Sequence, residues 1–184
     1  VKGEVMAVHG VVSLLDQVHY EKVEALWQEL RRRFDVGSPS VVHFPHFSYH
    51  GAESYDQERL SAVLAAAARE TRPFTLSAAG IALFPGPESV LYIPVSRSPK
   101  LTQLHTALWP QLEAVSGPSN AYYAPPVWFP HITLAQGDVT RDNLGPICRW
   151  LQQLNIAWTI SVVSFCLIYD TGQGYEIRHR FQFA

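Results

Sequence analysis

The sequence has little cysteine and no long apolar run. Its two cysteines, Cys148 and Cys166, form no Cys-x-x-Cys pair, so the sequence indicates neither a disulfide framework nor a zinc finger. The longest apolar stretches, such as ISVVSFCLIY at 160–169, are far shorter than the roughly 20 residues that cross a bilayer. The first ten residues, VKGEVMAVHG, contain no apolar segment followed by a small-residue cleavage site. We therefore expect a soluble, cytoplasmic protein without membrane association.

Charge is also scarce. The formal net charge is -2 and only 16% of the residues are charged, so no overall positive field exists to hold long nucleic acid by counterion release. The sequence has no Gly-x-Ser-x-Gly elbow and no Walker loop, which argues against a serine-triad hydrolase and a P-loop NTPase. If RNA is a partner, we expect it to bind by an end.

What the sequence does contain is enough apolar material for one domain over residues 1–184. With 47% hydrophobic residues, a chain of this length can bury a core. Residues 4–12 are apolar and β-branched and predict a strand, and residues 15–34 have helical periodicity. By the same patterns we expect further strands at 41–49, 72–84, 89–96, 128–135, 156–170 and 174–183, and further helices at about 56–71, 100–115 and 138–154.

Two similar hexapeptides share the pattern Phe-Pro-His-x-(Ser/Thr). FPHFSY at 44–49 returns as FPHITL at 129–134, so His131 lies 85 positions after His46 (131 − 46). The same offset maps the helix expected near residue 16 onto the one near 101. We therefore expect an α+β, bilobal fold of two β-α-β-α-β units, at about 4–84 and 89–169, with a closing strand at 174–183. Antiparallel sheets would form a central groove, with helices on the outer faces.

The repeated motif carries chemistry. In a strand, residues i and i+2 share a face, so His46 lies beside Ser48 and His131 beside Thr133. Two opposed imidazoles can supply the general base and the general acid of phosphodiester cleavage, since the unperturbed pKa of histidine is about 6.5. The two hydroxyls can donate hydrogen bonds to phosphoryl oxygens. A single His-x-Ser is more often structural, but two copies in one context favour a catalytic pair.

A metal site is the main alternative for these histidines, because His43, His46 and His50 are close in sequence. On a strand His43 faces away from His46, and His50 lies roughly 13 Å from it at about 3.3 Å per residue. No cysteine or carboxylate cluster accompanies them. We therefore expect neither a metal nor another cofactor.

Aromatic residues near the motifs are candidates for stacking on a nucleobase. Phe44 and Phe129 have the parity of the histidines, and Tyr122 and Tyr123 lie in the Gly/Pro-rich connection that precedes the second motif. Core packing remains an open alternative for each of the four. Tyr49 has the opposite parity and is expected in the core.

At these residues the sequence resembles the two-histidine (2H) phosphoesterase superfamily. That superfamily includes the bacterial RNA 2',3'-cyclic phosphodiesterases, historically called 2'-5' RNA ligases, and the plant and animal cyclic phosphodiesterases. The closing segment FCLIYDTGQGYEIRHRFQF at 165–183 is also similar to that family's last hairpin. The resemblance implies His46 and His131 as acid and base, Ser48 and Thr133 as phosphate ligands, and no metal requirement. The bacterial RNA enzymes often have a basic residue where Gln136 stands here.

The expected function is therefore a metal-independent phosphodiesterase that opens 2',3'-cyclic phosphates of RNA ends or nucleotides. Two alternatives stay open: an enzyme that cleaves or joins 2'-5' linked oligonucleotides, and a nucleotide-binding module without turnover. The expected partner is a nucleotide or RNA end carrying a cyclic phosphate, and we expect a monomer.

Overall fold

A computed structural model describes residues 9–37 and 42–184. These residues form four α-helices, one short 3-10 helix and nine strands in the order β1 (His9–Leu14), α1 (Gln17–Phe34), β2 (His46–Ala52), α2 (Gln57–Glu70), β3 (Phe74–Ala79), β4 (Ala82–Phe84), β5 (Val90–Pro94), α3 (Pro99–Glu113), η1 (Ala121–Tyr123), β6 (His131–Gln136), α4 (Arg141–Leu151), β7 (Ala157–Val162), β8 (Ser164–Asp170) and β9 (Tyr175–Gln182). The first part of the strand expected at 4–12 and the start of the one expected at 41–49 lie outside the described residues.

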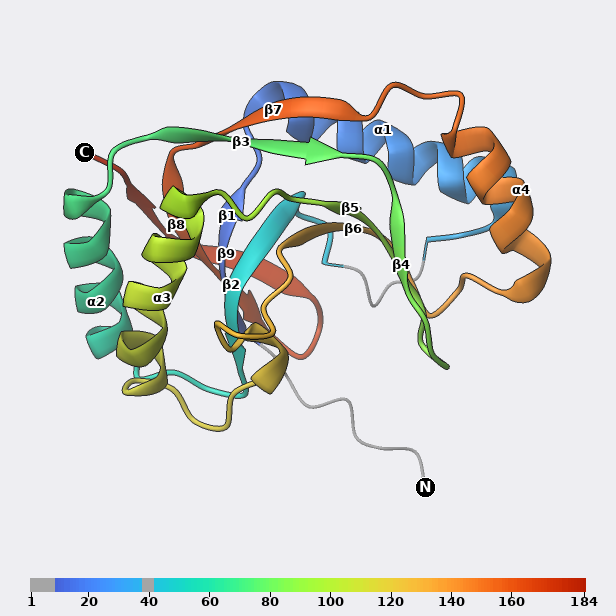
Figure 1. Ribbon diagram of the computed structural model, residues 1–184. Coiled ribbons are helices and arrows are strands. Elements are labelled where there is room, and N and C mark those ends of the chain that lie inside the picture. The colour runs from blue at the N-terminus through green and yellow to red at the C-terminus, as the bar shows by residue number, and fades with distance from the viewer. Residues whose placement is uncertain (1–8, 38–41) are drawn as a thin grey trace.

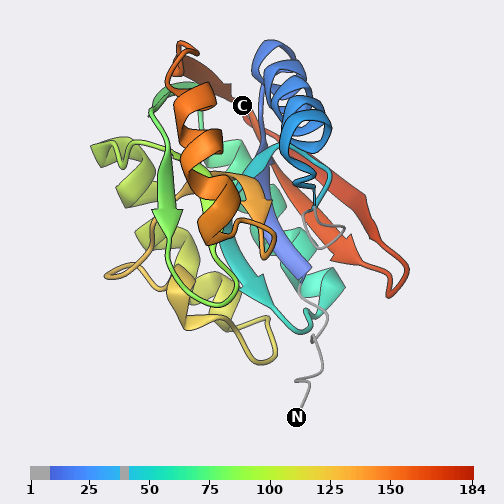
Figure 2. The ribbon, with the colours of Figure 1, turned by 90° about the vertical axis from the view of Figure 1, so that its right-hand side faces the viewer.

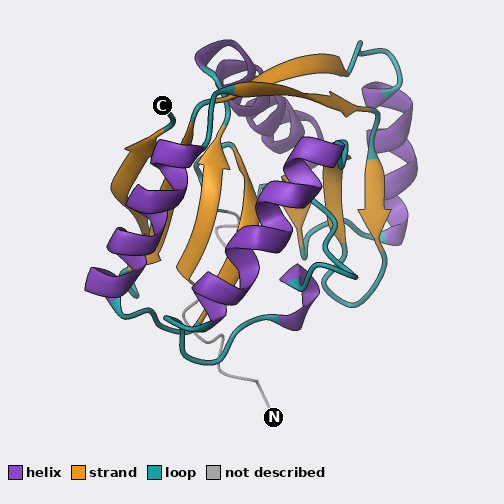
Figure 3. Ribbon diagram, turned by 60° about the vertical axis from the view of Figure 1, so that its left-hand side comes forward, coloured by secondary structure: helices purple, strands orange, loops and turns teal. Residues whose placement is uncertain are grey.

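The strands form three antiparallel sheets, with the strand orders β2-β1-β8-β9, β4-β5-β6 and β3-β7. Helices α2 and α3 lie side by side against the four-stranded sheet, whereas α1 and α4 lie together over the other half of the molecule (Figures 1 and 3). Viewed from the side, the β8–β9 hairpin projects away from the helices (Figure 2). The α+β, bilobal fold with antiparallel sheets and outer helices is confirmed.

Each lobe uses helices from both halves of the sequence. Helix α1, from the first half, contacts β6, and α3, from the second half, contacts β2. Each helix presents an apolar stripe at helical spacing, such as Leu101, Leu108 and Leu112 of α3, which are fully buried. The two lobes are thereby joined through one continuous hydrophobic core.

Two of the expected strands are in fact two strands each. The segment 72–84 divides at Gly80, whose φ of 73° is in the left-handed region that favours glycine. The segment 156–170 divides at Val163, between β7 and β8. In both cases the chain leaves the two-stranded β3-β7 sheet and enters another. The apolar pattern does not reveal such a change of sheet, because both sheets bury residues from these segments.

The two motif strands begin later than expected, at the histidines themselves. Pro45 and Pro130 immediately precede His46 and His131, and proline has no N–H to give to a strand ladder. Phe44 and Phe129 therefore precede β2 and β6, so strand parity does not apply to them, although both line the cleft described below. At the other end β2 continues to Ala52, beyond the end expected at residue 49.

Both motif strands contain a β-bulge directly after the hydroxyl residue. On β2, Ser48 pairs with Val12 and His50 with Val11, so Tyr49 is the extra residue. On β6 the corresponding extra residue is Leu134, which again lies 85 positions later. A bulge bends the strand and shifts the alternation of its faces. The matching bulges agree with the equivalence of β2 and β6, whereas the repeat boundaries stay a prediction.

Candidate functional site

A cleft of about 640 Å³ lies where the edge strands β2 and β6 approach each other. All eight residues singled out from the sequence line this cleft: His46, Ser48, His131, Thr133, Phe44, Phe129, Tyr122 and Tyr123. The lining is completed by Trp27, Val42, Phe84, Pro85, Glu88, Val90, Asn120, Val127, Trp128 and Gln136. The structure thus brings the two sequence motifs into one cavity, across the boundary between the lobes.

Both histidines are held in the same way. The Nδ1–H of His46 donates to the carbonyl oxygen of Phe44, and that of His131 donates to the carbonyl oxygen of Phe129 at 2.6 Å. A carbonyl oxygen can only accept a hydrogen bond, so Nδ1 carries the proton in each neutral ring. The Nε2 atom is then free to accept a proton, which is the form that a general base needs.

The electrostatics of the pair favour a neutral ring. Burial lowers the pKa of His46 to about 4, the Phe44 carbonyl opposes this shift, and the charge of His131 adds to it. Burial also lowers the pKa of His131, opposed by the Phe129 carbonyl. Because protonation of His131 disfavours protonation of His46, a pair with both rings protonated is the least favourable state.

The two hydroxyl residues are half-buried and lie on the same faces as their histidines. The Ser48 side chain forms a hydrogen bond with the phenol of Tyr123, while burial raises the pKa of that phenol. Both hydroxyls face the cleft, where they can donate to an anion.

The four aromatic candidates differ in exposure. The side chain of Tyr122 is 81% exposed and that of Phe129 is 50% exposed, and both stand at the mouth of the cleft. Phe44 instead packs against a small buried cluster formed by Val12, Leu14, Cys166 and Ile168. Tyr123 is half-buried. Tyr49 is fully buried, which confirms its expected place in the core.

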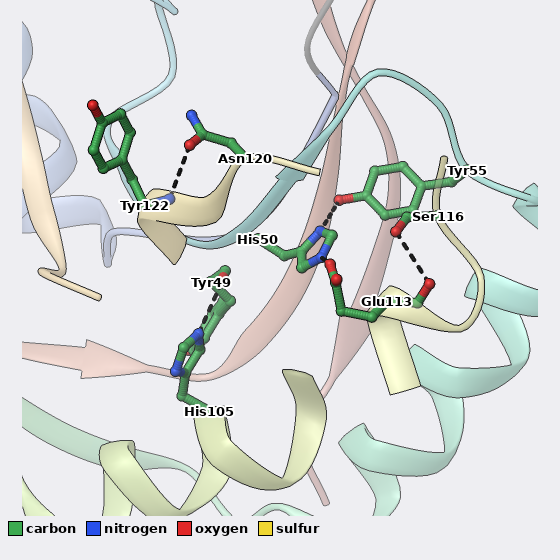
Figure 4. Close-up of polar contacts among 8 residues, drawn as sticks. All are labelled: Tyr49, His50, Tyr55, His105, Glu113, Ser116, Asn120 and Tyr122. Atoms are coloured by element: carbon green, nitrogen blue, oxygen red, sulfur yellow. Dashed lines mark hydrogen bonds and ion pairs between the residues drawn. The ribbon is translucent and has the colours of Figure 1, made fainter. Parts of the chain in front are cut away.

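The loop that carries the tyrosines is fixed to β2 by its backbone. The N–H of Asn120 donates to the Gly51 carbonyl at 2.9 Å, and the Asn120 side chain accepts from the N–H of Tyr122 at 3.0 Å. Figure 4 shows the polar contacts below this loop. There the fully buried His50 bonds to the Tyr55 hydroxyl at 2.6 Å and to the Glu113 carboxylate at 2.8 Å.

The three clustered histidines do not converge. His43 is exposed, His46 lines the cleft, and His50 takes part in the Tyr55–Glu113 network. Over residues 9–37 and 42–184, no three His, Cys, Asp or Glu side chains group in a way that could hold a metal ion. Within the same ranges, none of the helices is both long and apolar enough to pass through a membrane.

Among the cleft residues that the sequence did not single out, Trp27 and Trp128 contact the two motifs directly. The indole N–H of Trp27 donates to the Thr133 carbonyl at 3.1 Å, and that of Trp128 donates to the Ser48 carbonyl at 2.9 Å. In the sequence Trp27 fits the apolar stripe of α1, and Trp128, three positions before His131, has the strand parity of the face opposite to the histidine. Neither pattern contains a sign of contact with the motif of the other half.

Comparison with known proteins gives a family and a fold. Residues 19–174 match the family profile described as the 2'-5' RNA ligase superfamily. The structure is similar to E. coli LigT complexed with 3'-AMP, at 18% identity and a TM-score of 0.64, with 97% of this chain and 98% of that chain covered. It is also similar to TT0787 of Thermus thermophilus, at 16% identity, a TM-score of 0.66 and the same coverage. No curated protein matches the chain.

Proposed function

Because this chain belongs to the 2'-5' RNA ligase superfamily, within the 2H phosphoesterases, we propose that it is a phosphodiesterase that opens 2',3'-cyclic phosphates. The observation that carries the proposal is the pair of histidines in one cleft, each with Nδ1–H bonded to a backbone carbonyl and Nε2 available for proton transfer. The family supports phosphodiesterase chemistry in general. The cyclic phosphate is our assignment.

In the proposed reaction one histidine accepts a proton at Nε2 from water while the water oxygen attacks phosphorus. The bond from phosphorus to one ribose oxygen breaks, and that oxygen takes a proton from Nε2 of the other histidine. The product is a phosphate monoester with a free neighbouring hydroxyl. Ser48 and Thr133 donate hydrogen bonds to the non-bridging oxygens, which hold phosphorus between the rings and stabilise the charge that develops on them.

The exposed aromatic residues at the cleft mouth supply the base contact in this proposal. Tyr122 and Phe129 can stack on a nucleobase, a contact worth about 1–3 kcal/mol per base in single-strand binders. Phe44 and Tyr123 support the site from partly buried positions. The complex of LigT with 3'-AMP supports a nucleotide or RNA end as the partner. A cytoplasmic location, a monomeric state and activity without a metal remain predictions.

The test is hydrolysis of the four nucleoside 2',3'-cyclic monophosphates and of a short RNA ending in a cyclic phosphate, in excess chelator. The wild type should retain turnover, and His46→Ala and His131→Ala should each lower it by about 1,000-fold. His179→Ala is the matched control, because His179 is exposed on β9 and does not line the cleft. Loss of wild-type turnover in chelator would contradict the metal-free mechanism.

Two further substrates separate the alternatives. A 2'-5' linked dinucleotide that is cleaved faster than every cyclic phosphate would move the assignment to 2'-5' oligonucleotides. Binding of nucleoside 2'-monophosphates without turnover of any substrate would indicate a nucleotide-binding module. Any joining of RNA ends would be the reverse of cleavage, so hydrolysis should dominate in water.

A further inference from the structure

The two tryptophans of the cleft are bonded in a crossed arrangement. Trp27 belongs to the first half of the sequence, and its indole N–H bonds to the Thr133 carbonyl on β6. Trp128 belongs to the second half, and its indole N–H bonds to the Ser48 carbonyl on β2. Each phosphate-facing hydroxyl residue is thus fixed by an indole from the opposite half of the chain.

The bonded carbonyls lie on edge strands, next to interruptions of the strand pairing. β2 and β6 are edge strands, so each has carbonyls without a neighbouring strand. Ser48 and Thr133 also stand directly before the bulges at Tyr49 and Leu134, where the ladder is locally interrupted. A hydrogen bond at that place limits rotation of the peptide that carries the hydroxyl side chain.

The surroundings hold both indoles in place. Trp128 is buried, and its ring stacks on His105 with centroids 3.7 Å apart and planes at 17°. His105 itself donates from Nε2 to the carbonyl of Tyr49, the residue that follows Ser48. Trp27 sits on α1, which packs against β6, and its half-buried ring meets His43 edge-on at 6.2 Å.

We propose that Trp27 and Trp128 are positioning residues for the reaction, each acting through the hydroxyl residue of the opposite half. This inference rests on the proposed function. The two bonds set the distance between Ser48 and Thr133 across the lobe boundary, and so the point at which a phosphoryl group meets both histidines. Misplacement of a reacting group by about 1 Å can reduce the rate by about 100-fold.

The test uses Trp27→Phe and Trp128→Phe, which remove the N–H and keep an aromatic ring. Trp27→Phe should lower kcat about 10-fold or more and raise KM by a smaller factor, because the bond positions the Thr133 hydroxyl, whose contact with the phosphoryl group strengthens as charge develops in the transition state. Trp150→Phe is the matched control, since Trp150 packs on Phe34 outside the cleft. Thermal unfolding of every variant shows whether it is folded.

A crossed double-mutant cycle separates positioning from general support of the fold. In a Thr133→Val background Trp27→Phe should have little further effect on kcat, whereas in a Ser48→Ala background it should keep its full effect. Trp128→Phe should have little further effect in the Ser48→Ala background and its full effect in the Thr133→Val background. Equal effects in both backgrounds would overturn the proposal.

A second measurement keeps the inference independent of the substrate. If no diester is turned over, the proposed function fails. The affinity for inorganic phosphate, measured by NMR titration, then tests whether the tryptophans position the hydroxyl residues. Trp27→Phe should weaken phosphate binding in the wild type and not in Thr133→Val. A loss of affinity that is the same in both would contradict the positioning role.

Discussion

The two half-sites carry the same motif in different surroundings. The Nδ1 bond of His46 is partly buried, whereas that of His131 is exposed. Phe44 packs on a buried cluster, while Phe129 is half exposed. Beyond the bulge, β2 has Gly51 where β6 has Gln136 (136 − 85). The motif therefore supplies the same chemical groups twice, and burial gives the two copies different properties.

This difference suggests a division of roles between the histidines. A ring whose pKa is about 4, as for His46, is neutral at pH 7 and suited to accept a proton. Burial also lowers the pKa of His131, but its Nδ1 bond is the more exposed of the two, so we propose that His131 carries the proton that the leaving oxygen receives. We therefore assign His46 as base and His131 as acid in the predictions that follow.

The largest effects should come from the histidines. His46→Ala and His131→Ala should each lower kcat by about 1,000-fold, within the range of general acid–base contributions. A 2'-deoxynucleoside 3'-(4-nitrophenyl phosphate) has a leaving group that needs no proton, so its cleavage should survive in His131→Ala and not in His46→Ala. Survival in His46→Ala instead would reverse the assignment of acid and base.

Substitution of the two hydroxyl residues should cause the next largest loss of activity. Ser48→Ala and Thr133→Val should each lower kcat/KM by about 100-fold, as expected for one preorganised hydrogen-bond donor. Only Ser48 bonds to a phenol, that of Tyr123, so Tyr123→Phe should cause a smaller loss that is absent in a Ser48→Ala background. The same loss in both backgrounds would show that Tyr123 acts elsewhere.

The two phenylalanines should affect different quantities. Phe129→Ala should raise KM about 10-fold through lost stacking on the base, with little change in thermal stability. Phe44→Ala should instead lower the free energy of unfolding by about 2 kcal/mol, because it empties part of a packed cluster. Steady-state kinetics and chemical denaturation measure the two effects. A large loss of stability in Phe129→Ala, or a raised KM without a loss of stability in Phe44→Ala, would contradict the difference between the two half-sites.

Stability should fall in mild acid. Burial lowers the pKa of His46 and of His105 to about 4 from 6.5, so the unfolded chain takes up protons first. Stability is full above pH 6.5 and is lost as the pH falls toward 4, by on the order of 2 kcal/mol for the buried His105. Unfolding free energies across this range should have a smaller pH slope in His105→Gln than in the wild type, and an equal slope in the two proteins would contradict the role of His105.

The smallest effect concerns the position after the second bulge. The bulge brings Gln136 onto the face of Thr133, because Val90 and Tyr92 oppose these two residues. Gln136→Arg should raise kcat/KM about 3-fold for an RNA end relative to a mononucleotide, and added salt should remove the gain. Gln136→Met is the uncharged control, and a gain that persists at high salt would contradict an electrostatic cause.

Much of this protein was predictable from local rules. The strand period of two placed His46 with Ser48 and His131 with Thr133, and the 85-residue offset indicated that the two strands are equivalent. The helix positions followed from apolar stripes, and in the structure the side chains of Asp16 and Thr140 cap the N-termini of α1 and α4. These features depend on neighbours within a few residues along the chain, so sequence patterns record them.

The tertiary structure alone decided which segments far apart in the sequence meet. The indole bonds of Trp27 and Trp128 and the bond of His50 to Glu113 join residues far apart in sequence. The change of sheet at Val163 likewise depends on pairing with distant strands. The unequal burial of the two histidines has the same origin, because desolvation depends on every segment packed around a side chain. Sequence determined which groups are present at the site, and long-range packing determined where they stand and how readily each takes a proton.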